Sequence, residues 1–225
     1  MFSIFKKNKP DDELTRIFKE KGFYCDEYVQ AFIHSRKHLS SDDHFTLCEL
    51  YIEMERYNDA QKELLSVKPG SLLDIITTGQ LAFCQIALYM GTGEYDDAKA
   101  VYEDKVKFLD TFMKNPVRCR IAGDYYSYAA TICAMIGDEK KKETYFARMR
   151  EWCDIYPKHR ILLDITEVAT LYAKAAALAG VTPDEAKSAK ETCRDTILNF
   201  QDFNYEWERA YYLRKLERTQ RLYLV

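Results

Sequence analysis

The sequence predicts an all-α protein, and three observations support that prediction. The 225 residues include only 8 glycines and 5 prolines, too few for the turns of a β-rich or loop-rich chain. Apolar residues recur at helical spacing, in segments of roughly 12 to 20 residues separated by short turn signals. One helical hairpin pattern also repeats along the chain. We therefore expect one domain, residues 1–225, folded as a right-handed α-α superhelix of about five helical hairpins with a C-terminal capping helix.

An N-terminal helical pair is expected within residues 1–40. Pro10 and the three acidic residues after it are typical of a helix start, because proline suits the first turn and acids complement the positive end of the helix dipole. This helix is expected to end near Gly22. A second helix is expected over residues 26–38.

The repeat core is expected over residues 41–200, with the capping helix in residues 201–225. Ser40 and the acids after it provide an N-cap for the first core helix. Proline and glycine mark the breaks at Lys68-Pro69-Gly70 and at Asn115-Pro116. The remaining helices are expected from Tyr57 to before Lys68, over 72–90, 95–113, 118–136, 139–156 and 161–179, from Thr182 onward, and over 205–224.

The clearest repeat is Gly93-Glu94-Tyr95-Asp96-Asp97-Ala98, with Tyr89 four residues before it and Tyr102 four residues after Ala98. It is typical of the turn between two paired helices. A weaker copy lies 38 residues upstream, around Tyr57-Asn58-Asp59-Ala60. The turn glycines Gly93, Gly137 and Gly180 follow one another at 44 and 43 residues.

The stretch from Tyr89 to Tyr102 resembles the tetratricopeptide repeat, which has a tyrosine in its first helix, Gly-Asp-Tyr-Asp-Glu-Ala across the turn and an aromatic residue four positions later. The resemblance extends over residues 41–200, with longer spacing than the family's usual repeat of about 34 residues. The first copy has Glu55 at the position of the turn glycine. The third has Lys142 at the small-residue position, which predicts a local shift of register or a wider helix spacing.

The resemblance implies a concave surface lined by the first helix of each hairpin. Family members that hold a peptide's terminal carboxylate use Lys, Arg and Asn there, whereas this chain has apolar, small or acidic residues, so an amphipathic helix or extended peptide is the expected ligand. The alternative is that Phe83 and Met90 pack within the superhelix. The expected partner-binding residues are Phe45, Glu49, Ile52, Phe83, Ala87, Met90, Ser127, Thr131 and Lys174.

Composition favours a cytoplasmic protein that does not bind nucleic acid. The formal charge of −3 and pI near 5.9 provide no attraction for nucleic acid. The sequence has no apolar run of about 18 residues, so stable membrane insertion is not expected. Residues 1–10 also lack the apolar core of a signal peptide. The cysteines are widely spaced, contain no C-x-x-C pair, and are expected to be reduced core residues: Cys25, Cys48, Cys84, Cys119, Cys133, Cys153 and Cys193.

The strongest candidate for metal chemistry is His34-x-x-x-His38, with Asp42, Asp43 and His44 after it. Residues four apart share a helix face, so two imidazoles could bind one ion. Arg36 and Lys37 lie between the two histidines, and their positive charges would oppose a divalent ion. The sequence contains no H-E-x-x-H, G-x-S-x-G or phosphate-loop pattern. We therefore expect no catalytic residue, cofactor or metal, and keep a metal-binding protein or enzyme built on these histidines as an alternative.

The two ends carry further interaction candidates. The strip Phe2–Lys7 mixes apolar and basic residues and is expected to be a frayed terminus or to pack on the first helix, with contact to a membrane surface as the alternative. The C-terminal helix is expected to cap the last repeat, with homodimer formation as an alternative. The sequence thus predicts a non-catalytic scaffold that binds a protein or peptide, or alternatively a peptide-sensing regulator, although no DNA-binding helix-turn-helix is visible.

Overall fold

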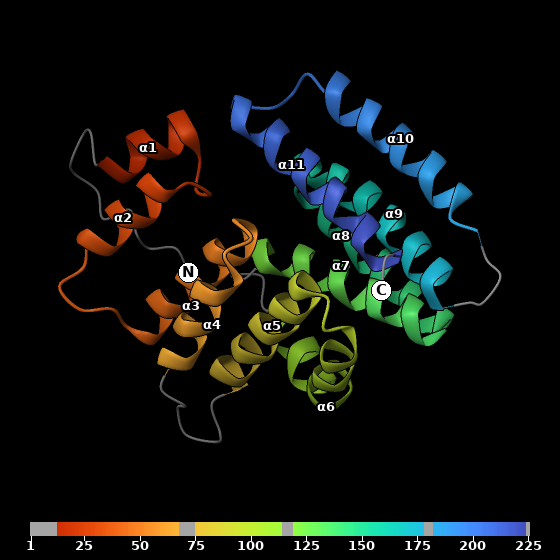
Figure 1. The fold of residues 1–225 in the computed structure, drawn as a ribbon, viewed down its shortest axis with the longest axis horizontal. Helices are drawn as coiled ribbons and strands as arrows, with labels where there is room; N and C mark the ends of the chain where they lie inside the picture. Colours follow the sequence, from red (N-terminus) through yellow and green to blue (C-terminus); the bar gives the residue numbers. More distant parts are fainter. Residues whose placement is uncertain (1–12, 68–74, 114–118, 178–181, 224–225) are drawn as a thin grey trace. The chain divides into compact units, whose positions relative to one another are not determined.

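A computed structural model describes residues 13–67, 75–113, 119–177 and 182–223, and all of their regular structure is helical (Figure 1). The all-α prediction is therefore confirmed. Contacts divide the chain into two compact units, residues 1–118 and 119–225. The boundary between the two units follows Arg118, just after Pro116. The sequence predicts one domain over residues 1–225, with internal parts at 1–40, 41–200 and 201–225.

Helical hairpins form the first unit, and two of them join where α5 (Ile75–Thr92) packs on α3 (Ser41–Glu53) and α4 (Tyr57–Ser66). Leu47, Ile86 and Leu109 are almost completely buried, and each such side chain contributes about 1.5–3 kcal/mol when it leaves water. Each helix packs on its chain neighbour within a hairpin, and α5 also packs on both α3 and α4. The hairpins are α1 (Glu13–Lys21) with α2 (Asp26–His34), α3 (Ser41–Glu53) with α4 (Tyr57–Ser66), and α5 (Ile75–Thr92) with α6 (Tyr95–Met113).

The second unit is organised around α9 (Arg160–Ala177), which packs on α7, α8, α10 and α11. Its buried residues cover most of the helix circumference, as expected of a helix with neighbours on several sides. The elements around it are α7 (Cys119–Ile136), α8 (Glu139–Ile155), the 3₁₀ turn η2 (Pro157–His159), α10 (Asp184–Asn199), α11 (Glu206–Thr219) and the 3₁₀ turn η3 (Gln220–Tyr223).

Three hairpin turns share one backbone conformation. Glu55, Gly93 and Gly137 have φ of 60°, 85° and 74°, in the left-handed region that glycine enters without strain. At each turn the next residue's N–H donates to the carbonyl five positions earlier, which is the hydrogen bond of the Schellman motif. These bonds join Arg56 to Tyr51 (2.8 Å), Glu94 to Tyr89 (2.9 Å) and Asp138 to Cys133 (2.9 Å).

The residue five positions after each left-handed turn is buried against the paired helix. Ala60 and Ala98 are fully buried, as their small size permits. In the hairpin of α7 and α8, Lys142 occupies this position and is 8% exposed. Its Nζ lies 2.5 Å from Glu139 Oε2 and 3.4 Å from Glu143 Oε1. Burial opposes the charge on Lys142, but the hydrogen bond that its ammonium donates to Glu139 raises its pKa overall. The Lys142 stem is thus buried between the helices, while its charged end lies beside the exposed carboxylates of Glu139 and Glu143.

The second helix is shorter than the sequence predicts, because α2 ends at His34 rather than at residue 38. The Ser35 hydroxyl donates to the Phe32 carbonyl (2.7 Å), which satisfies one of the carbonyls at the helix end. The Arg36 side chain donates to Asp43 at the start of α3 (3.2 Å). The residues between α2 and α3 therefore form a connection rather than a further helical turn.

The predicted cap of the next helix is present. The Asp43 N–H donates to the Ser40 hydroxyl (3.2 Å), and the Asp43 carboxylate accepts from the Ser40 N–H (2.9 Å). This reciprocal pair is a capping box, worth about 1 kcal/mol. Burial opposes the charge of Asp43, but the hydrogen bonds from Ser40 and Arg36 lower its pKa overall.

The left-handed turns at Glu55 and Gly137 predict opposite effects for two substitutions. Gly137→Ala should lower the free energy of unfolding by about 1 kcal/mol, because φ is positive there although space is open around the new methyl group. Glu55→Gly should instead raise it by about 0.5 kcal/mol, because strain relief exceeds the added chain entropy. Urea unfolding of the two variants checks both signs, and a neutral Gly137→Ala would contradict the turn assignment.

A second prediction concerns Gly123 on α7, whose missing side chain leaves room for the Trp152 ring. That ring is 6% exposed and stacks on His159 at 4.7 Å, so it has little freedom to move. Gly123→Ala should therefore destabilise the protein by about 1–3 kcal/mol, despite alanine's higher helix propensity. In the matched Trp152→Phe background, where the ring is smaller, the same substitution should be tolerated better. Equal losses in both backgrounds would contradict the packing argument.

Candidate functional site

The apolar residues of the predicted partner-binding face are mostly core residues. Phe45 and Ile52 on α3, and Phe83 and Ala87 on α5, are each at most 5% exposed. These two helices pack on one another. The burial of Phe83 agrees with the alternative that it packs within the fold. In the first unit, the predicted residues that keep partial solvent access are Glu49 and Met90.

In the second unit the predicted residues form internal hydrogen bonds and ion pairs. Thr131 is buried and its hydroxyl donates to the Ser127 carbonyl (2.9 Å), while the Ser127 hydroxyl accepts from the buried Thr166 (2.7 Å). Lys174 lies 2.8 Å from Glu139 Oε1. Ser127 and Lys174 remain half-buried. The accessible part of the predicted face is therefore mainly polar, and its binding role stays a prediction.

The two histidines of the metal hypothesis do not share a helix face, because α2 ends at His34. His38 lies in the connection to α3, and both side chains are exposed. His44 Nδ1 lies 2.7 Å from Glu63 Oε2 on α4, so that ring is engaged elsewhere. No group of three or more His, Cys, Asp or Glu side chains that could hold a metal ion occurs in the described part of the chain.

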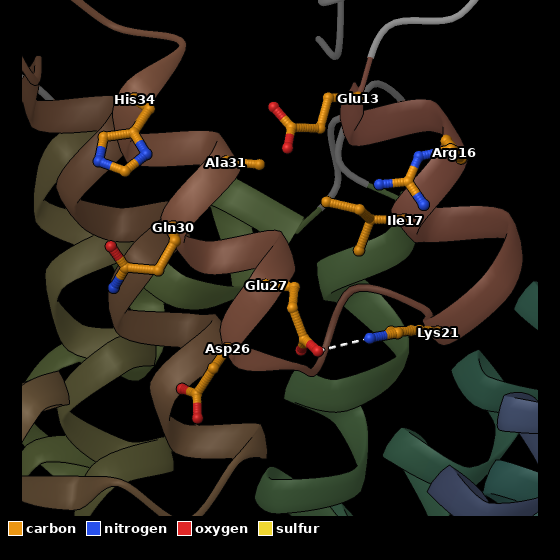
Figure 2. A pocket seen from close by; sticks show the side chains of 9 residues that line it. All are labelled: Glu13, Arg16, Ile17, Lys21, Asp26, Glu27, Gln30, Ala31 and His34. Carbon is orange, nitrogen blue, oxygen red and sulfur yellow. Dashed lines mark hydrogen bonds and ion pairs between the residues drawn. The ribbon is translucent and has the colours of Figure 1, made fainter.

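An open pocket of about 360 Å³ lies between α1 and α2 (Figure 2). In Figure 2, Glu13, Arg16 and Ile17 of α1 lie opposite Ala31 of α2, and Gln30 and His34 flank Ala31 on α2. Ile17 and Ala31 are buried at its base, at 4% and 8% exposure, whereas the polar side chains around them are exposed. The sequence argument missed this pocket, because its lining is also the ordinary pattern of two amphipathic helices.

An ion pair closes one end of the pocket, where Lys21 Nζ lies 2.5 Å from Glu27 Oε1 (Figure 2). The hydrogen bond that Lys21 donates to Glu27 raises the pKa of Lys21, and the same bond lowers the pKa of Glu27. Asp26, at the same end, pairs with Arg56 at the start of α4. Arg16 pairs with Glu20 at 3.0 Å along α1. The pocket thus has an apolar base and a rim of charges that are largely matched.

The described cysteines are free thiols in predominantly buried positions, as their spacing predicts. Cys48 on α3 and Cys84 on α5 are nearly unexposed, and their thiols contact each other across the two helices. That hydrogen bond and burial raise the pKa of Cys84 well above its usual range. No local sequence pattern indicates this contact, because the residues lie 36 positions apart. The thiol form that a high pKa favours is a poor nucleophile and metal ligand.

The C-terminal helix α11 packs on α9 and α10. Lys215 is 9% exposed and its Nζ lies 2.8 Å from Asp124 Oδ1 on α7. Glu217 accepts from Lys190 (2.6 Å) and Arg194 (3.3 Å) on α10. These charges therefore attach α11 to its own unit. Its predicted role in a homodimer stays a prediction.

The predicted N-terminal strip Phe2–Lys7 lies outside the described residues. None of the described helices has both the length and the apolar character that a membrane span requires.

Asp164 on α9 is the carboxylate whose surroundings oppose its charge. Burial and then Glu167 raise its pKa, although Arg160 acts in the opposite direction. Its charge also acts on Cys153 and Cys193, and burial followed by Asp164 raises the pKa of Cys193 to about 12. Perturbed groups of this kind mark active sites as well as structural positions. Among the described residues Asp164 belongs to no group of His, Cys, Asp or Glu side chains that could hold a metal ion.

Asp164 yields a pH-dependent prediction. Because its pKa is raised on folding, the folded protein holds this proton more tightly, and the carboxylate becomes unfavourable as pH rises through the raised pKa. Asp164→Asn should therefore raise the free energy of unfolding at about pH 7, with a smaller gain at about pH 3, where the carboxyl is protonated in both states. Urea unfolding at the two pH values measures this. The exposed Asp195→Asn on α10 is the control, and a destabilised Asp164→Asn at pH 7 would contradict the argument.

No family model, curated protein or solved structure matches the chain, so the functional argument comes from its own side chains and packing.

Proposed function

We propose that the chain is a non-catalytic, tetratricopeptide-like scaffold that binds a protein or peptide on the face of its first helices. The observation that supports this most is the packing order within each unit. In each unit the first helix of one hairpin packs on both helices of the hairpin before it, as α5 does on α3 and α4, and α9 on α7 and α8. Stacked helical repeats are built in this way, and they function by presenting a surface.

The shared turn geometry supports the same proposal. Glu55, Gly93 and Gly137 hold one backbone conformation and start equivalent second helices, which is the behaviour of a repeated unit. A cytoplasmic location belongs to the proposal as well. It is supported by the free, buried thiols, which suit a reducing compartment.

The binding contacts that we propose are the accessible members of the predicted face. Met90 provides a flexible apolar contact, and Glu49 provides a carboxylate, both half-buried in the first unit. Ser127 and Lys174 are their counterparts in the second unit. In the first unit a partner peptide would therefore be held by mixed contacts, with Glu49 orienting it and Met90 covering apolar surface.

The test compares affinity capture by three versions of the full chain from lysate of its native cells, quantified by mass spectrometry. Met90→Lys and Glu49→Lys alter the proposed face at two positions that are half-buried rather than fully buried. Leu65→Lys is the matched control, because Leu65 is 80% exposed on the second helix α4. Each version is first shown by circular dichroism to be folded.

We expect at least one partner to be lost by roughly tenfold with the two face variants and retained with Leu65→Lys, since an unpaired charge at a contact costs about 1–3 kcal/mol. Binding of that purified partner to the three versions then confirms a direct contact. Equal capture by all three would contradict the first-helix face, and loss with Leu65→Lys alone would move the binding surface to the second helices.

A further inference from the structure

The pocket between α1 and α2 combines two properties that a side-chain binding site needs. Its volume of about 360 Å³ accommodates a long amino-acid side chain, and it is open to solvent (Figure 2). Its base is apolar, since Ile17 and Ala31 are buried there. An extended aliphatic stem would contact the small part of these two residues that solvent still reaches, together with the methylene groups of the longer side chains around them, such as Arg16 and Gln30.

The charges of the pocket rim favour a cationic ligand. Three carboxylates line it, against two permanent cations. Both cations already have acidic partners, Arg16 with Glu20 at 3.0 Å and Lys21 with Glu27 at 2.5 Å. An incoming anion would have to displace one of these carboxylates or lie beside it. A cation meets no such competition.

Glu13 is the carboxylate toward which a cation would be drawn. Among the described residues it has no ion-pair partner, in contrast to Asp26, which pairs with Arg56, and Glu27. Figure 2 shows its carboxylate pointing across the pocket toward Ala31. The rim therefore places a carboxylate above an apolar base, an arrangement that complements a cation on an aliphatic stem.

We propose that this pocket binds the lysine or arginine side chain of a partner peptide, with the methylene groups over Ile17 and Ala31 and the cationic head at Glu13. The site lies on the N-terminal helical pair. It is therefore additional to the first-helix face of α3, α5, α7 and α9, and neither proposal depends on the other.

The test uses methyl NMR of the full chain, following Ile17 and Ala31. The probe is N-acetyl-lysine N-methylamide, and the matched neutral probe is N-acetyl-glutamine N-methylamide. We expect saturable shifts of both methyl signals with the lysine probe and none with the glutamine probe. Glu13→Gln should weaken binding by about threefold, and added salt should weaken it further, because the ion pair is exposed.

Glu94→Gln is the matched variant, because Glu94 is also an exposed acid at a helix start in the same unit but does not line the pocket. Its affinity for the lysine probe should equal that of the unsubstituted chain. Unchanged methyl signals elsewhere in the Glu13→Gln spectrum show that the fold is retained. Equal shifts with both probes, or full affinity in Glu13→Gln, would overturn the proposal.

A further variant separates a partner's cation from the chain's own. Lys6, Lys7 and Lys9 precede Glu13 closely in the sequence, and their joint substitution by glutamine removes three cations. If the pocket serves a partner, this variant leaves the Ile17 and Ala31 signals unchanged and the probe affinity unaltered. Shifted signals together with tighter probe binding would identify the chain's own lysines as the occupant, which overturns the proposal of a partner.

Discussion

The left-handed backbone conformation at the hairpin turns is the constraint on which the other features depend. A single residue at positive φ, closed by a hydrogen bond to the carbonyl at the end of the first helix, reverses the chain in a fixed geometry. That geometry determines which residue of the second helix meets the first. It is Ala60 and Ala98 in two hairpins and Lys142 in a third. The turn therefore dictates burial even where the residue is charged, and Glu139 provides the compensating carboxylate.

Stacking of the hairpins has a direct consequence for binding. When α5 packs on α3, the large apolar residues of both helices, such as Phe45 and Phe83, become core residues. Half-buried side chains such as Glu49 and Met90 remain for a partner. The α1–α2 pair keeps an open pocket with an apolar base and a charged rim. The two candidate surfaces thus differ in chemistry, and a partner of one need not resemble a partner of the other.

Sequence reasoning succeeded where the deciding interaction is local. The start of α3 was predictable, because Ser40 and Asp43 lie three positions apart and form their capping box within one turn. The end of α2 at His34 was not predicted; beyond it Arg36 donates to Asp43 of the next helix, a contact that spans seven positions. The candidate site shows the same division. Helical spacing placed Phe83 on the inner side of its helix. A residue on that side can line an open groove or pack in the core, and the spacing alone does not distinguish the two; in the structure Phe83 is buried.

The sequence by itself determined the helical class, most helix boundaries and the repeated turns, because capping, glycine placement and 3.6-residue periodicity act over a few neighbouring residues. Only the tertiary structure decided how the chain divides at Arg118, which inner residues are buried, that Cys48 contacts Cys84, and that α1 and α2 enclose a pocket. Each of these depends on residues far apart in the chain. Their proximity is set by the packing of whole helices, which no local pattern encodes.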